Sequence, residues 1–544
     1  MARRRQAEVV RVRADLILMG GRVSTLDPDR PAATAVACAG GRIVAVGPDH
    51  EVVPLAGPST RIIAVAGRCV TPGFIDSHMH LSWLGLGLAN IDLSGVRSLA
   101  ALQELVRERV QGEPAGSWVL GRGWDHELLG VLPARHHLDA VAPGHPVLLT
   151  RVCGHVAVAN SKALEVAGIT RETPDPAGGA IDRDERGEPT GVLREEAMEL
   201  VRCRIPAPGV EELARALAAG ARHALATGIT SVHSNDGTFG QGIEFVPQAY
   251  RRAREMGMRL RVWWDFPGEA LPEVRERGWT SGQGDEWFRV GSAKFFADGS
   301  LGGGTAALSE PYADDPGSRG ILTVDPADLA RGVALAREAG IQVAVHAIGD
   351  RAIELVLDAL ERSGPWPTAP RMIHCQVMRA ELFPRMKTCG VVADLQPRFV
   401  SSDKRFAEKR LGPARARLSY AWRLFLDHGI PVAFGSDCPV EPIAPMLGVF
   451  AAVTRCDTEG EPPGGWYPEH RLTVEEAVRG FTLGAARAVG EDDEKGSLSP
   501  GKLADLVVWD PDPFAVGPMV LKDVRPVLVV VGGQVVYEAD PGGQ

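Results

Sequence analysis

The chain has 544 residues, a formal net charge of −10 at pH 7 and a hydrophobic fraction of 45%. This composition is typical of a globular protein with a sizeable core, and the acidic balance disfavours nucleic acid as a partner because phosphate binding needs a basic face. The basic opening residues are not followed by an apolar run, and no segment is long enough to span a bilayer, so we expect a cytoplasmic protein without a membrane partner.

The two ends of the chain share one pattern, in which short β-type runs alternate with glycine turns. Such runs occupy residues 14–19 near the start and residues 504–509 and 527–531 near the end. Either end alone would give a marginal sheet. We therefore predict that residues 1–72 and 488–544 pair into one β-sandwich.

Between these ends, over residues 73–487, short apolar strands alternate with amphipathic helices. Apolar strands are expected at residues 228–233, 342–346 and 431–434. Alternation over about 400 residues predicts an α/β protein with a closed (β/α)₈ TIM-like barrel. An open, doubly wound sheet is the alternative, but no glycine-rich phosphate loop follows any strand. Helical periodicity is clear at residues 99–110, 211–226, 326–339, 352–361 and 473–489.

One region interrupts this alternation. Residues 116–204 are rich in glycine, proline and charged residues and contain several short β-type pieces, which predicts an insertion beside the barrel mouth. The eight cysteines of the chain are scattered and form no CxxC pair. That pattern favours reduced thiols in the cytosol over a disulfide framework.

The first polar strand end follows the run that begins at Gly73. Asp76, His78 and His80 alternate along this run, so they share one face of a strand. Two imidazoles at the C-terminal end of a barrel strand would point to the face where barrel active sites are built. The alternative is a pair of surface histidines near a turn, but the buried-type run before them favours metal ligation.

Later strand ends carry Lys294, His346, His374 and Asp437. A charged lysine amid apolar residues is costly to bury, so it usually shifts its pKa or finds a special partner, although it could also extend its amine to solvent. One histidine at a strand end is more often structural than a ligand. Two histidines and an aspartate at three further strand ends are harder to attribute to packing, and such donors suit zinc and related divalent ions.

These residues and their surroundings resemble the amidohydrolase superfamily over essentially the whole chain. His78 and His80 look like its first-strand signature, and the run from Gly435 to Asp437 looks like its last-strand aspartate. The stretches 294–302 and 346–352, together with 178–181, resemble the YtcJ-like branch, which includes N-substituted formamide deformylases.

The resemblance implies a binuclear metal centre with two divalent ions, with Zn²⁺ as the expected metal. Lys294 would be carboxylated by CO₂ and would bridge the two ions. The remaining ligands implied are His78, His80 and Asp437 for the first ion and His346 and His374 for the second.

Such a centre predicts a hydrolase that cleaves a C–N bond other than a peptide bond, in an amide or an N-substituted formamide. Two ions would convert a bridging water to hydroxide near neutral pH, and one ion would polarise the substrate carbonyl. Asp437 would take the proton of the attacking water and pass it to the departing nitrogen.

Three alternatives stay open at this point. A mononuclear-metal deaminase of the same fold would need a glutamate in an HxxE pattern, which is missing after His346, and it would give Lys294 no task. A cyclic amidase of the same fold fits the ligands equally well. A non-catalytic binding protein is the least supported, because a degraded site should lack ligands.

Four further residues are candidates for the substrate pocket because of their expected position near the barrel mouth. Trp83 and Trp124 could equally belong to the core, and His233 could be packed at a strand end. We expect a small-molecule amide as the partner, while the sequence leaves the oligomeric state open, including a homo-oligomer. The pocket candidates are Trp83, Trp124, His155 and His233.

Overall fold

The computed structural model describes residues 13–540, so the basic opening residues lie outside the described range. The described chain divides into two compact units. The first unit combines the residues up to Trp83 with those from Gly220 onward, and the second is Leu84–Ala219. The barrel and both terminal segments belong to the first unit.

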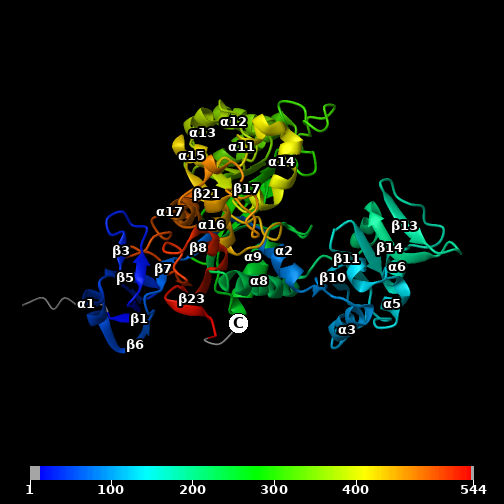
Figure 1. Cartoon of the computed structure of the whole chain (residues 1–544), viewed down its shortest axis with the longest axis horizontal. Coiled ribbons are helices and arrows are strands. Elements are labelled where there is room, and N and C mark those ends of the chain that lie inside the picture. Colours follow the sequence, from blue (N-terminus) through cyan, green and yellow to red (C-terminus); the bar gives the residue numbers. More distant parts are fainter. Residues whose placement is uncertain (1–12, 541–544) are drawn as a thin grey trace, which may run out of the picture. The chain divides into compact units, whose positions relative to one another are not determined.

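Eight parallel strands form a nearly closed barrel sheet in the first unit (Figure 1). All residues of β8 (Phe74–Met79) and β19 (Arg371–His374) are buried, as expected for parallel strands that are covered on both faces. This arrangement confirms the predicted TIM-like barrel. In sheet order the strands are β8 (Phe74–Met79), β15 (Ile229–Asn235), β16 (Arg261–Pro267), β17 (Phe288–Phe296), β18 (Val343–Ala347), β19 (Arg371–His374), β20 (Val392–Leu395) and β21 (Val432–Phe434).

The two ends of this sheet are joined at the C-terminal ends of β8 and β21. The backbone N–H of Asp437 donates to the carbonyl of His78 at 2.7 Å, and the N–H of His80 donates to the carbonyl of Cys438 at 2.8 Å. Gly435 lies between them, where a Cβ atom would come within 2.5 Å of the His78 nitrogen. A glycine is therefore required for the close approach of the two strand ends.

The helices around the barrel agree with the predicted periodicity to within about two residues. Helices α11 (Pro326–Glu338) and α12 (Asp350–Ser363) follow β17 and β18. The single helix predicted over 473–489 is instead divided by a π-helical turn, η5 (Gly480–Gly484), between α17 (Val474–Arg479) and α18 (Ala485–Ala488). A Cβ atom at either glycine of this turn would lie 2.3 Å from an atom of β21, so the turn lies where the barrel strand approaches the helix most closely.

Strands from the two ends of the chain meet in one sheet. Strand β7 (Cys69–Pro72) pairs antiparallel with β22 (Leu506–Asp510) in a six-stranded sheet of order β24-β23-β22-β7-β2-β3. A second sheet, of order β5-β4-β1-β6, comes from the first segment alone. Residues of both sheets, among them Leu16 and Val530, belong to one buried apolar cluster. The described strands are β1 (Ala14–Met19), β2 (Arg22–Ser24), β3 (Ala32–Ala33), β4 (Ala35–Ala39), β5 (Arg42–Gly47), β6 (Ala56–Ala64), β23 (Arg525–Val531) and β24 (Gln534–Glu538).

The second unit has its own mixed sheet and its own core. Helix α3 (Leu99–Val110) buries Leu102 and Val106 in a cluster that also contains Trp124. The unit contains the residues predicted as an insertion, 116–204, and also includes α3, which packs with this sheet. The strands, in sheet order, are β9 (Ile91–Asp92), β10 (Val119–Trp124), β11 (Val147–Arg151), β12 (Val156–Ala159), β14 (Pro189–Glu195) and β13 (Gly179–Arg183).

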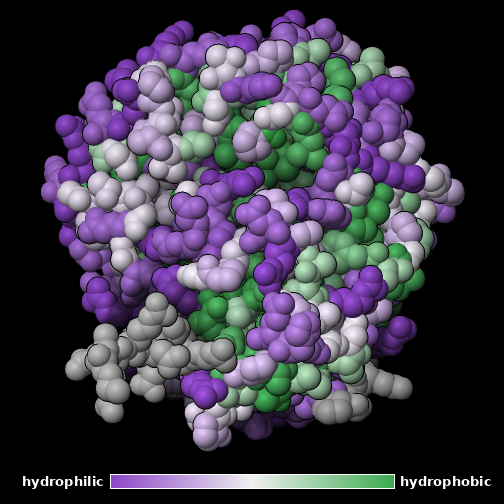
Figure 2. All heavy atoms as spheres, turned by 90° about the vertical axis from the view of Figure 1, so that its left-hand side faces the viewer, coloured by the Kyte–Doolittle hydropathy of each residue, from purple (hydrophilic) through white to green (hydrophobic). Residues whose placement is uncertain are grey.

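Hydrophilic residues cover much of the face shown in Figure 2, and hydrophobic residues appear between them. Among the described residues, no helix is both long enough and apolar enough to cross a membrane.

Candidate metal centre and active site

Six side chains predicted as metal ligands meet at the C-terminal ends of the barrel strands. Strand β8 carries His78, with His80 just beyond it, and the loop after β21 carries Asp437. The other three are Lys294 in β17, His346 in β18 and His374 at the end of β19. Parallel strands present their C-terminal ends on one side of a barrel, which is why residues up to 359 positions apart in the sequence converge.

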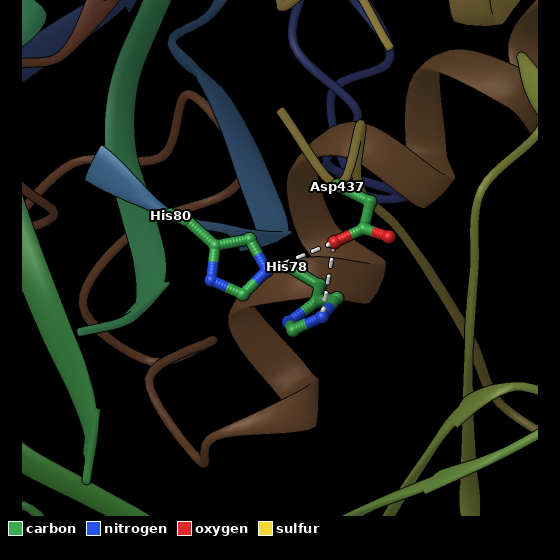
Figure 3. Close-up of side chains that lie close together, drawn as sticks. All are labelled: His78, His80 and Asp437. Atoms are coloured by element: carbon green, nitrogen blue, oxygen red, sulfur yellow. Dashed lines mark hydrogen bonds and ion pairs between the residues drawn. The ribbon is translucent and has the colours of Figure 1, made fainter. Parts of the chain in front are cut away.

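The tightest group consists of His78, His80 and Asp437. The Nε2 atoms of His78 and His80 lie 3.4 Å and 3.1 Å from the same oxygen, Oδ1 of Asp437, and all three side chains are buried (Figure 3). Their potential ligand atoms all lie within 4.8 Å of one another. The other carboxylate oxygen, Oδ2, points away from both rings in Figure 3.

The protonation of this group suits a metal. The Nδ1 atom of His80 lies 2.9 Å from the carbonyl oxygen of Asn235, to which it donates, and Nε2 is the nitrogen directed at Asp437. Burial lowers the pKa of His78 well below its usual value, so this ring is neutral. Its Nδ1 atom is buried without a hydrogen-bond partner. Two imidazole rings and a carboxylate whose ligand atoms lie this close together are the donor set of a zinc-type ion.

Lys294 is buried beside this group. Its Nζ atom lies 3.2 Å from Nε2 of His78, and among the described residues no carboxylate oxygen lies within 4.0 Å of it. Burial is the main cause that lowers the pKa of Lys294 to about 8, against partial compensation by Asp437 and Asp265. An amine with a pKa of about 8 is about one-tenth neutral at pH 7.

His346 and His374 lie against the first group. Their ring centroids are 4.5 Å apart, and the ring of His374 is 5.6 Å from that of His78. Nε2 of His346 lies 3.0 Å from the carbonyl oxygen of Gly299, and Nδ1 of His374 lies 2.7 Å from Oε1 of Gln396. The nitrogens left for a ligand are thus Nδ1 of His346 and Nε2 of His374.

The backbone at two of these strand ends is held in the left-handed region. The φ angles are 79° at His374, 44° at Cys375 and 58° at Asp437. Left-handed conformations of such residues cost on the order of 1–3 kcal/mol each and persist only where the surrounding structure enforces them, which is common at functional sites.

A cavity of about 560 Å³ opens onto these residues and is lined by five of the six candidate ligands; Lys294 is buried beside them. Most of its wall is apolar, and the ring of Trp83 stacks on that of His80 at a centroid distance of 4.4 Å. Its size falls in the usual range for small-molecule sites. The lining side chains include Trp83, Pro267, Phe296, Leu301, Ile348, Phe399, Phe406 and Val440.

A family model described as the amidohydrolase family matches residues 61–537. The chain belongs to the amidohydrolase family. The resemblance found in the ligand motifs is therefore confirmed over most of the chain, and it extends from the first barrel strand to the last.

Individual relatives of this amidohydrolase agree with the family match. The protein YtcJ of Bacillus subtilis (strain 168), an amidohydrolase by its name, is 37% identical over 485 residues, which are 88% of this chain and 91% of that protein. The N-substituted formamide deformylase of Arthrobacter pascens is 30% identical over 546 residues, or 96% and 98% of the two chains. The crystal structure of an uncharacterised metal-dependent hydrolase from Pyrococcus horikoshii OT3 matches with a TM-score of 0.77 and 30% identity, over 92% of this chain and 99% of the other. The chain is thus a metal-dependent hydrolase of this family.

The four predicted pocket residues of the amidohydrolase lie in different places. Trp83 lines the cavity. His233 is fully buried within β15, and it does not line the cavity. In the second unit, Trp124 belongs to the apolar core and donates from its indole N–H to the Leu149 carbonyl, while His155 is exposed and lies 2.8 Å from Glu195. Packing within that unit accounts for Trp124.

Two aspartates with no role assigned from the sequence hold segments that carry the candidate ligands. Asp76 accepts hydrogen bonds from the backbone N–H and the hydroxyl of Ser436, directly before Asp437, and burial raises its pKa to about 7. Asp298 accepts from the backbone N–H groups of Ile348 and Gly349 and lies 3.4 Å from Nε2 of His346. Asp298 lies within the stretch 294–302, whose resemblance to known relatives is the only signal that could have indicated it.

A buried ionic group crosses the barrel interior and was also missed. Arg371 on β19 lies 2.8 Å from a carboxylate oxygen of Asp265 on β16 and 2.8 Å from one of Asp394 on β20. Ser77 on β8 donates to the other oxygen of Asp394 at 2.6 Å. All of these side chains are fully buried. The group thus ties together four of the strands that carry or flank the ligands.

Proposed function

We propose that this amidohydrolase hydrolyses a C–N bond of an amide or an N-substituted formamide at a binuclear metal centre. The observation that carries the proposal is the convergence of four histidines, an aspartate and a buried lysine without a carboxylate partner at the mouth of an apolar cavity. A packing role alone would not gather four histidine rings, with neighbouring ring centroids 4.5–5.6 Å apart, around a buried lysine.

The donor set fits two divalent ions, and nitrogen and carboxylate donors favour zinc. When bound, such ions would activate a water molecule and polarise the carbonyl of the substrate. The first ion would be held by His78, His80 and Asp437, and the second by His346 through Nδ1 and His374 through Nε2.

Lys294 would link the two groups as a carbamate. Its neutral amine can add to the carbon of CO₂: the N–C bond forms as one C=O π bond becomes a carboxylate oxygen, and the nitrogen loses a proton to water. The resulting carbamate would supply oxygen ligands for metal where an amine now faces His78. The low pKa of Lys294 supports this step because only the uncharged amine is a nucleophile.

Asp437 would manage the proton. Burial alone would raise its pKa, but the neighbouring His80, His374 and Lys294 lower it below the ordinary value, so the carboxylate is ionised. Its Oδ2 atom is directed away from the histidines and can accept the proton of the attacking water. The same oxygen would then donate this proton to the departing nitrogen, which is otherwise a poor leaving group.

A mononuclear deaminase is less well supported by the cavity. Such an enzyme needs a free glutamate near the metal, and Glu441 is the only glutamate among the cavity-lining residues. Glu441 is paired with Arg398 at 3.1 Å. A single ion would in addition leave the buried Lys294 without a task.

The metal content of the purified protein tests the proposal. We expect about two zinc ions per chain by plasma mass spectrometry, and a sharp decrease in Lys294→Ala but not in the exposed control Lys387→Ala. The zinc-loaded protein with bicarbonate should release formate from N-alkylformamides or acid from secondary amides. One ion per chain that is unaffected by Lys294→Ala would contradict the bridging role, and the absence of amide or formamide turnover in a two-metal protein would contradict the reaction.

We also propose domain boundaries for this amidohydrolase. Residues 1–72 and 488–544 would form one β-sandwich, and residues 73–487 would form the catalytic barrel with the insertion at 116–204. Pairing of β7 with β22 and the shared apolar cluster support the first part. A cytoplasmic location remains a prediction from the scattered cysteines, all eight of which are unpaired.

A further inference from the structure

One wall of the cavity is a single face of helix α14 (Phe399–Ala416). The residues of this helix that line the cavity are spaced three and four positions apart, as a helical face requires. Two phenylalanines, Phe399 and Phe406, flank a polar pair, Ser402 and Asp403. A carboxylate thus lies within an otherwise aromatic wall of the site.

Asp403 is held by neutral groups only. The hydroxyl of Tyr420 donates to its Oδ2 atom at 2.7 Å, and the hydroxyl of Ser402 lies 3.2 Å from Oδ1. Among the described residues no lysine, arginine or histidine forms an ion pair with it within 4.0 Å, and the charged neighbour that acts on it is the acidic Glu441. Burial raises the pKa of Asp403 to about 6, so it is mostly ionised at neutral pH.

The second carboxylate on the wall has a different environment. Glu441 also lines the cavity, but Arg398 neutralises it through Nε at 3.1 Å. Asp403 is therefore the carboxylate of the wall that lacks a positive partner. Asp403 is half-buried, and a carboxylate partly removed from water without such a partner is costly unless a ligand supplies one.

We infer that Asp403 recognises a positively charged nitrogen of the substrate, so the cavity selects an amide or formamide whose apolar body carries an ammonium or amidinium group. The inference deepens the proposed function and rests on it for the nature of the scissile bond. The N–H groups of such a cation would form charge-assisted hydrogen bonds with Asp403. The faces of Phe399 and Phe406 would cover the apolar body and attract the cation further.

A matched pair of probes tests this specificity by calorimetry on the zinc-loaded protein. Benzamidinium is a cation with an aromatic body, and acetophenone is a neutral molecule of similar shape without a bond that a hydrolase could cleave. We expect the wild-type protein to bind benzamidinium about tenfold or more tightly than acetophenone. In Asp403→Asn this ratio should fall to about one, because the amide keeps the hydrogen bond from Tyr420 but loses the charge.

Two further variants separate charge from structure. Asp403→Glu keeps the charge and should retain a preference for benzamidinium. Asp427→Asn removes one negative charge from an exposed residue of α15 (Trp422–Asp427) and should leave the ratio of the two affinities unchanged. Thermal melts of all variants show whether the fold is retained.

Each outcome decides the inference. If the wild type binds both probes equally, or binds neither at millimolar concentration, the inference is wrong. It is also wrong if Asp403→Asn keeps the preference in a folded protein. Calorimetry detects binding without turnover, so a protein that prefers benzamidinium but cleaves no amide would contradict the proposed reaction and leave the cation site standing.

Discussion

The two units of this amidohydrolase differ in the polar groups that they bury. In the second unit, Leu84–Ala219, Asn160 is the one fully buried polar side chain. Its Oδ1 atom accepts from the N–H groups of Val147 and Ala163, and its Nδ2 atom donates to the carbonyls of Ala142 and His145. All four hydrogen bonds of this amide are satisfied within the unit.

The barrel interior of the first unit is different. It buries four histidines, a lysine and several aspartates, and some of their polar atoms, such as Nδ1 of His78, have no partner. Buried polar atoms in native proteins are nearly always paired, so unpaired ones call for an explanation. We call a buried polar group closed when protein groups satisfy all its hydrogen bonds, as for Asn160, and open when some of its polar atoms lack a partner, as for the histidines of the barrel. A closed set indicates a structural role, whereas an open set indicates a ligand-binding role.

The largest effect, on turnover, should come from a change at Asp437 in the open set of the barrel. Asp437→Asn should lower turnover by about 10²–10⁴-fold because the amide cannot accept and return a proton. Its oxygen can still face the two histidines, so we expect most of the metal to be retained. Turnover should be measured in a metal-replete assay with metal content determined in parallel. The exposed Asp427→Asn serves as the control, and near-normal turnover of Asp437→Asn would refute its role as base.

The buried ionic group beneath the site should show the largest effect on stability. Arg371→Met leaves Asp265 and Asp394 without their positive partner, which should cost about 3–5 kcal/mol in free energy of unfolding by urea. The exposed pair of Arg479 with Glu475 offers a control, since Arg479→Met should cost less than about 1 kcal/mol. Equal costs for the two variants would show that burial does not distinguish them.

The candidate ligands of the open set can be predicted from the sequence, but the buried ionic group beneath them cannot. His78 and His80 alternate on one strand, and Lys294, His346, His374 and Asp437 lie at strand ends, so the barrel rule alone brings them to one side. Arg371, Asp265 and Asp394 lie on three separate strands, each among mostly apolar neighbours. Nothing local in the sequence indicates that they pair across the barrel interior.

The same limit applies to the second unit and to single aromatic residues. Helix α3 was predicted with its correct bounds, yet its packing on β10 depends on contacts that are remote from its own periodicity. Trp83 lines the cavity and Trp124 lies in a core, although both tryptophans were predicted to lie near the barrel mouth. Side-chain environment, and not residue type, separates these two cases.

A substitution in the closed set around Asn160 should lower stability without changing the metal content. Asn160→Ala leaves several backbone groups of the second unit unpaired, which should cost about 1–3 kcal/mol. The metal content of the folded protein should stay at the wild-type value, as plasma mass spectrometry would show. Loss of metal from a folded Asn160→Ala protein would contradict the division between structural and ligand-binding polarity.

The smallest effect is expected where a polar pair of the second unit lies at the surface. Arg194 donates from Nε and Nη2 to the two oxygens of Asp182 at 2.8 Å and 2.7 Å, the same forked geometry that Arg261 forms with Asp505 in the first unit. Arg261 and Asp505 are buried, whereas the Arg194 side chain is 45% exposed. A double-mutant cycle with Arg194→Met and Asp182→Asn should give a coupling of about 0.2–1 kcal/mol, because water and salt screen the exposed charges. A larger coupling that persists in high salt would mean that geometry, and not burial, sets the strength of these pairs.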